Sequence, residues 1–119
     1  MSNNNSNNNS EHTEKTFNVA GPVNDGTIVA SFEADKILYL SYQIIAVLSG
    51  APDVTFTLIK KNDKNAPWFD TGESVSMNIS GVQQAFLELD LAKSEHYAIR
   101  VNSVAGGSVD SLKIYLEGK

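Results

Sequence analysis

The chain has 119 residues, 41% of them hydrophobic and 19% charged, with a formal net charge of −5 and no cysteine. This size and composition predict one globular domain without disulfides or thiolate metal sites. The acidity argues against a nucleic-acid partner, which needs a basic face to displace counterions. No apolar run is long enough to span a membrane, and the N-terminus lacks the pattern of a secretory signal. We therefore expect synthesis in the cytoplasm without export.

Residues 1–14 form a polar arm, whose opening MSNNNSNNNS has Met1 as its one apolar residue. Such a segment cannot bury enough apolar surface to offset the entropy lost on ordering. Two interpretations remain open: a flexible tail, or an arm that orders on a partner. In the second, Asn3, Asn4 and Asn5 are candidate contacts, because side-chain amides both donate and accept hydrogen bonds.

The domain expected over residues 15–119 is a succession of segments in which apolar and polar side chains alternate with period two, as in β-strands. Gly, Pro, Asn or Asp separate these segments, and no segment has a sustained helical period. The pattern predicts an all-β fold, an antiparallel β-sandwich or jelly roll of about eight strands. The expected strands are 16–20, 27–33, 37–48, 54–60, 74–80, 85–91, 96–104 and 110–117.

The outward positions of these strands carry more apolar side chains than a solvated sheet needs, which favours packing between subunits. These positions are Val29, Ile37, Tyr39, Ile45, Val47, Ile59 and Tyr115. The candidate interface consists of Ile37, Tyr39, Ile45, Val47 and Tyr115. We expect a homo-oligomer, with a trimer as the first hypothesis.

The sequence offers little for catalysis. A hydrolytic triad or a histidine metal site needs a fixed histidine beside other catalytic groups. The two histidines are His12, in the arm, and His96, at the start of a strand, which we interpret as an exposed turn residue. We identify no catalytic residue, metal ligand or cofactor site, and expect no enzyme. Calcium at the oxygen-rich stretch 62–73 is a weak alternative, opposed by the neighbouring lysines.

Residues 60–73, KKNDKNAPWFDTGE, are the stretch most like a ligand loop, and they hold the only tryptophan. Period two sends Trp68 and Phe69 to opposite faces, so one of them points inward or lies against the sandwich edge. We favour Trp68 as a packing anchor for this strand connection; a protein interface and sugar stacking remain open. In the sugar interpretation, Asp63, Trp68 and Phe69 form the ligand loop.

Three segments resemble small β-sandwich proteins of tailed-bacteriophage virions. They are DVTFTLIKKNDKNAPWFDTGE, the stretch from Gly21 to Glu33, and YAIRVNSVAGGSVDSLKIYLEG, which resembles a last hairpin with a glycine-rich turn. The resemblance covers residues 16–118 in pattern, without a diagnostic motif. The same strand order occurs in discoidin-like carbohydrate and lipid modules.

The resemblance implies a non-enzymatic virion component, such as a capsid decoration (cement) protein, or a head-fibre or tail accessory domain. It implies a virion location, attachment through the N-terminal arm, and virion proteins such as the major capsid protein as partners. The alternative is a carbohydrate-binding module that recognises a surface glycan.

Overall fold

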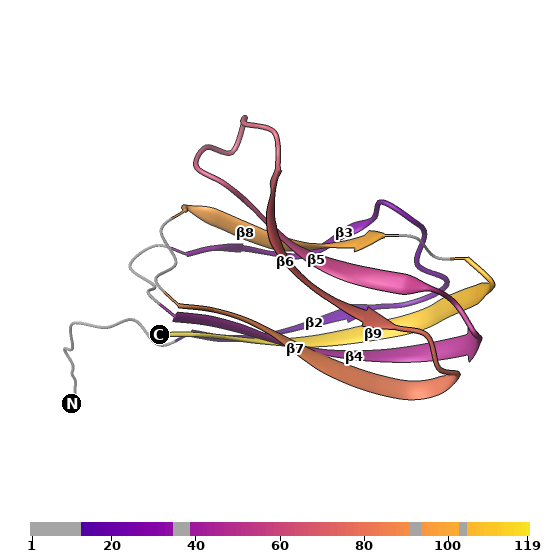
Figure 1. Ribbon diagram of the computed structural model, residues 1–119. Helices are drawn as coiled ribbons and strands as arrows, with labels where there is room; N and C mark the ends of the chain where they lie inside the picture. Colours follow the sequence, from indigo (N-terminus) through magenta and orange to yellow (C-terminus); the bar gives the residue numbers. More distant parts are fainter. Residues whose placement is uncertain (1–12, 35–38, 91–93, 103–104) are drawn as a thin grey trace, which may run out of the picture.

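The protein forms two facing antiparallel β-sheets (Figure 1). The computed structural model describes residues 13–34, 39–90, 94–102 and 105–119, and these residues contain eight strands. The predicted β-sandwich is therefore confirmed. The strands are β2 (Thr13–Val19), β3 (Ile28–Glu33), β4 (Tyr39–Gly50), β5 (Val54–Lys61), β6 (Phe69–Met77), β7 (Gly81–Asp90), β8 (His96–Asn102) and β9 (Gly107–Gly118).

The strand order is that of a jelly roll. One sheet has the order β2-β9-β4-β7 and the other β3-β8-β5-β6. We call them the lower and upper sheets, after their places in Figure 1. Successive strands alternate between the sheets, except β5 and β6, which pair as neighbours in the upper sheet. Two sheets of four strands with this order make the eight-stranded double-sheet form of the fold.

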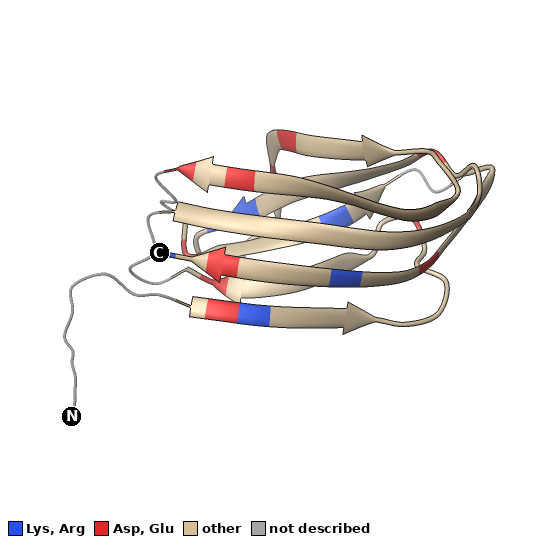
Figure 2. Cartoon of the chain, turned by 90° about the horizontal axis from the view of Figure 1, so that it is seen from below, with Lys and Arg blue, Asp and Glu red and all other residues tan. Residues whose placement is uncertain are grey.

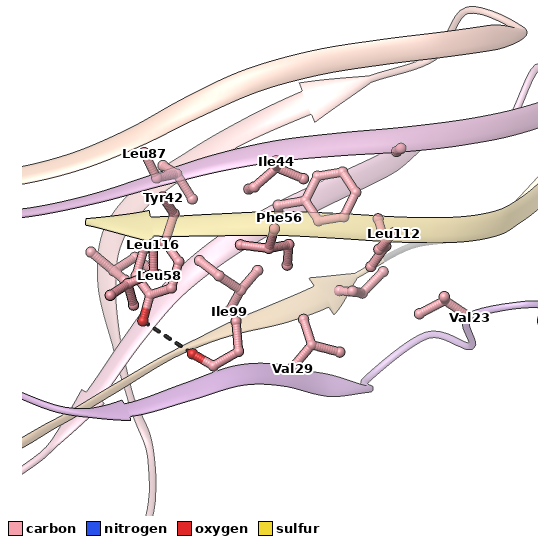
Figure 3. Packing of buried hydrophobic residues seen from close by; sticks show 14 of the residues in the cluster. Val23, Val29, Tyr42, Ile44, Phe56, Leu58, Leu87, Ile99, Leu112 and Leu116 are labelled. Carbon is pink, nitrogen blue, oxygen red and sulfur yellow. Dashed lines mark hydrogen bonds between the residues drawn. The ribbon is translucent and has the colours of Figure 1, made fainter. Parts of the chain in front are cut away.

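The core lies between the inward faces of the two sheets, where apolar side chains from both layers meet (Figure 3). Tyr42 and Ile44 point inward from β4, and Phe56 and Leu58 point inward from β5. The predicted inward faces of β4, β5, β8 and β9 are confirmed. Each such side chain contributes about 1.5–3 kcal/mol through burial, so the core requires no disulfide or metal.

Strand β3 departs from the predicted alternation. Val29 pairs with Ile99 and Phe32 with Tyr97, so β3 has one residue more than β8 over this span. Ala30 absorbs this β-bulge with a positive φ of 56°. As a result Val29 is buried, whereas Ile28 is 42% exposed. The prediction that Val29 faces outward is wrong, because the extra residue shifts the alternation.

The glycine-rich segment before β9 is a connection between the sheets, and the expected final hairpin is wrong. β9 pairs with β2 and β4 in the lower sheet, while β8 lies in the upper sheet. Gly107 lies so close to β4 that an added Cβ would be 2.3 Å from the Ser49 carbonyl oxygen. Glycine is therefore required where β9 begins to pair with β4.

Several strand ends differ from the predicted ones. β2 begins at Thr13, inside the segment assigned to the arm, and β6 begins at Phe69 instead of residue 74. Ile79, expected inward in a strand over 74–80, lies after β6 and is exposed. Between Thr57 and Ile59 of β5 the partner on β6 moves from Ser74 to Asp70, so β6 has two residues more than β5 over this span. Beyond this irregularity β6 remains paired with β5 as far as Phe69, which explains its early start.

A buried hydrogen bond joins the two sheets. The Tyr42 hydroxyl, on β4, donates to the Ala30 carbonyl in the β3 bulge at 3.2 Å, marked by the dashed line in Figure 3. Burial raises the pKa of the Tyr42 hydroxyl, so it remains protonated and able to donate. The bond gives a partner to a carbonyl that the bulge leaves outside regular strand pairing.

We expect Tyr42→Phe to lower the free energy of unfolding by about 1–2 kcal/mol, because it leaves a buried acceptor without this donor. Urea denaturation followed by far-UV circular dichroism measures the change. The control is Tyr115→Phe on the outer side of β9, which we expect to have no effect. Equal stability of the Tyr42→Phe variant and the parent would show that the bond does not stabilise the bulge.

Candidate interaction surface

The residues of the lower sheet that point away from the core form one continuous surface, which we call the lower outer face. Tyr115 and Phe86 pair with Gln43 from its two sides. Two residues further along β4, Ile45 pairs with Lys113 of β9 and with Gln84 of β7 in the same way. Directly paired residues lie on the same side of a sheet. The lower outer face is therefore organised in rows that cross β9, β4 and β7.

Large apolar side chains are exposed along this surface. Val82 is 68% exposed, Phe86 53%, Tyr115 40% and Val47 36%. β4 runs through the middle of the lower sheet without a charged residue (Figure 2). A contiguous exposed apolar surface on a small domain is typical of an interaction site.

The lower outer face unites most of the predicted interface. Tyr39, Ile45, Val47 and Tyr115 all lie on it, from β4 and β9. Ile37 and the arm residues Asn3, Asn4 and Asn5 lie outside the described residues. The sequence therefore predicted which residues of β4 point outward, because the period-two pattern continues over the length of the strand.

Sequence reasoning did not select Val82 and Phe86, which are the most exposed apolar residues of this face. The expected strand began at residue 85, so Val82 was outside it, whereas β7 begins at Gly81. Phe86 lies within the expected strand 85–91, on the same side of the alternation as the charged Glu88 and Asp90, which gives that side a polar character in the sequence. The alternation of β7 was the signal that could have identified Phe86.

The lower outer face divides into an acidic end and an apolar end. At the acidic end, Glu14, Glu117 and Glu88 belong to the row that crosses Ser41. Figure 2 shows acidic positions of β7 and β9, in red, near the C-terminal end of the chain. Tyr39 donates to Glu88 there at 2.5 Å, and this hydrogen bond raises the pKa of Tyr39.

The apolar end lies at the opposite end of the face, around Ile45 and Val47. A hollow of about 370 Å³ lies there, lined also by Val19 and Ala20 at the end of β2 and by Lys113 of β9. Val82, on β7, pairs with Val47 of β4. This end has the apolar character of the buried centre of a protein–protein contact.

The outer face of the upper sheet is polar by comparison. Arg100 bonds to Asn102 at 3.1 Å and forms an ion pair with Asp70 at 3.4 Å. Asn102 in turn donates to the Thr57 hydroxyl at 2.9 Å. Ile59, which we predicted as an outward apolar residue, is fully buried beside this network. Ile59 therefore adds no exposed apolar surface here, and this face lacks the character of the lower one.

The candidate ligand loop is the tip of the β5–β6 hairpin, which projects beyond the upper sheet in Figure 1. Trp68 is half-buried, with the Lys61 ammonium 4.3 Å from its ring centre. Phe69 is 63% exposed, so neither ring belongs to the core. Asp63 accepts a bond from the Asn65 backbone N–H at 2.8 Å, which shapes the turn. The ring of Trp68 thus contacts Lys61, inside the hairpin itself.

His96 differs from its predicted setting. It is buried at the start of β8, whereas the sequence suggested an exposed turn histidine. Its Nε2 lies 3.5 Å from the Glu95 carboxylate. Pairing with Glu33 and Lys61 on the neighbouring strands covers it from both sides. Within the described residues, no three His, Asp or Glu side chains are grouped to hold a metal ion.

We expect Trp68→Ala to lower the free energy of unfolding by about 1–2 kcal/mol, since a half-buried ring contributes less than a core aromatic. The substitution also removes the ring beneath the Lys61 ammonium, which keeps its hydrogen bond to the Lys64 carbonyl. Phe69→Ala is the matched control, because the Phe69 ring is more exposed, and we expect it to have little effect. Thermal melts followed by circular dichroism test both variants. Equal melting temperatures for Trp68→Ala and the parent would exclude an anchoring role.

Comparison with known proteins establishes the fold. No protein-family model matches the chain, and no curated protein sequence matches it. The solved structure of the SPBc2 prophage-derived protein YomS is similar with a TM-score of 0.52 and 13% sequence identity. The match covers 91% of this chain and 96% of YomS. The described residues contain no helix suited to spanning a membrane. At this level of identity the likeness shows a shared β-sandwich architecture.

Proposed function

We propose that this protein is a non-enzymatic structural component of a bacteriophage virion, and that it assembles through the lower outer face. The exposed apolar surface of that face carries the proposal. The fold likeness to a prophage-derived protein supports a phage origin, as does the resemblance of the sequence to virion β-sandwich proteins. Jelly rolls occur in both viral capsid and lectin domains, so the surface and not the fold must decide between the two.

The lower outer face is large enough for a specific contact. Four strands about 4.8 Å apart and roughly 30 Å long give a footprint on the order of 600 Å². Stable interfaces bury about 600–1,000 Å² on each partner. The area of the face is therefore of the order that a contact between subunits needs.

A second copy of the chain is the first partner we propose for this face. Two acidic ends repel each other, so the subunits meet through their apolar ends around Val47 and Val82. Burying these two side chains, which are 36% and 68% exposed, supplies the hydrophobic centre of the contact. We propose a trimer first, in which the apolar ends of three subunits meet around one three-fold axis.

Within a virion, we propose capsid decoration with the N-terminal arm as the attachment element and the major capsid protein as its partner. The arm leads into β2, which is an edge strand of the lower sheet. An edge strand presents backbone N–H and C=O groups to a neighbouring chain. Attachment and self-assembly would thus share one side of the molecule.

The alternative of a carbohydrate site in the hairpin loop has less support. Sugar stacking needs an accessible aromatic face. The Lys61 ammonium stands over the Trp68 ring at 4.3 Å, and the ring is half-buried. Asp63, for its part, is engaged in shaping the turn. The hairpin is better explained as a structural connection.

We expect Val47→Lys to dissociate the homo-oligomer, because a charge at the centre of an apolar contact is costly to desolvate. Sedimentation velocity at micromolar concentration measures the assembly state. The control is Ser76→Lys, an exposed position on β6 in the other sheet, which we expect to leave the oligomer intact. A parent protein that sediments as a monomer would refute self-assembly through this face.

We expect removal of residues 1–12 to leave the melting temperature unchanged while reducing incorporation into virions. The deletion stops before Thr13, so it leaves β2 whole. Quantitative mass spectrometry of purified particles gives the copy number of full-length and truncated chains. If the truncated chain were incorporated at the full copy number, the arm would have no part in attachment.

A further inference from the structure

A hollow of about 310 Å³ lies at the base of the β5–β6 hairpin. Two lysines line it from the end of β5, namely Lys60 and Lys61. The hairpin adds apolar side chains to the lining, from Ala66, Pro67 and Phe69. The volume is at the lower end of the range of about 300–1,000 Å³ for small-molecule sites. The hollow therefore suits a group about the size of one amino-acid residue.

Lys60 continues the inward side of β5 beyond the core. It follows Phe56 and Leu58 in the alternation, and it pairs with Tyr97, which is buried. Lys60 itself is half-buried, and its ammonium lies 5.8 Å from the centre of the Phe69 ring. A charge in such partly desolvated surroundings attracts a counterion more strongly than a charge in bulk water.

The existing contacts of the two lysines leave hydrogen-bond donors for a ligand. An ammonium has three N–H donors. Lys61 donates one to the Lys64 carbonyl at 3.0 Å, and its ammonium lies 4.3 Å from the centre of the Trp68 ring. These ring contacts position the ammonium groups without supplying a carboxylate or carbonyl acceptor. Both lysines can therefore still donate to an anion in the hollow.

The carboxylates of this region have other partners. Asp63 accepts a hydrogen bond from a backbone N–H of its own turn, and Glu95 lies 3.5 Å from the His96 imidazole. Over the part of the chain that the structure describes, neither Lys60 nor Lys61 forms an ion pair. Two positive charges thus share one hollow in a protein with a net charge of −5. A bound anion would relieve their repulsion.

The apolar part of the lining selects the form of the anion. A phosphate group has three strong acceptor oxygens and up to two charges, so it needs more donors than two ammonium groups on an apolar wall. A carboxylate attached to an apolar group matches both parts of the hollow. We infer that this hollow binds such a carboxylate, with the charge on the lysines and the apolar group against Ala66, Pro67 and Phe69. The C-terminal residue of a polypeptide and a free carboxylic acid share this chemistry.

The single tryptophan of the chain gives a readout without a label. Because the Lys61 ammonium lies over Trp68, a ligand that bonds to Lys61 should change the Trp68 emission. The first probe is acetylated alanyl-alanyl-leucine with a free C-terminal carboxylate, and its C-terminal amide is the control. Isocaproate has the same carboxylate and isobutyl group without the peptide. The free-acid peptide should bind saturably, and the amide should not. Stronger binding of the peptide than of isocaproate supports a polypeptide terminus, and equal binding supports a free acid.

Lys60→Gln should weaken binding of the free-acid peptide by about tenfold or more, because it removes a charge-assisted hydrogen bond. Lys64→Gln is the matched control: it removes the same charge from the same hairpin, outside the lining, and should bind as the parent does. Val47→Lys should also bind as the parent does, so this inference can fail independently of the proposed assembly. Equal binding of the amide or of inorganic phosphate would overturn the inference. So would a Lys60→Gln variant that is folded by circular dichroism and retains the affinity of the parent.

Discussion

The architecture depends on the contact between the inward faces of two sheets that share no backbone pairing. Burial of apolar side chains holds these layers together, and it does not by itself select one alignment. The Tyr42–Ala30 hydrogen bond is directional and joins β4 of the lower sheet to β3 of the upper sheet. It also accounts for a left-handed residue that is not glycine, since Ala30 adopts the bulge conformation where this donor reaches it. The bulge in turn brings both Val29 and Phe32 into the core.

The two outer faces of the sandwich have different chemistry although the same core supports them. On the upper sheet, polar groups such as Arg100, Asp70 and Asn102 are bonded to one another. Such a face is already satisfied and offers a partner little to gain. On the lower sheet, Val82 and Phe86 remain in contact with solvent. The lower outer face therefore has apolar surface still to bury, which is why we propose it as the interaction surface.

Within the lower outer face, the chemical character changes along the strands. The apolar end gains free energy from a partner that excludes water, so it suits the contact that we propose with a second subunit. At the acidic end, the carboxylates are costly to desolvate, so a subunit contact is less favourable there.

The amino-acid sequence by itself determined the all-β class, because period two is a local property that a strand imposes on its own residues. It also placed Tyr39, Ile45, Val47 and Tyr115 on the outward sides of their strands. Only the tertiary structure decided that β4 and β9 are neighbours, which puts these four residues on one face. It likewise decided that Val29 is buried, through a bulge, and that Ile59 is buried although it faces outward. The strand order, the bulges and the burial of outward-facing side chains depend on contacts between residues far apart in the chain. Local alternation carries no information about these contacts.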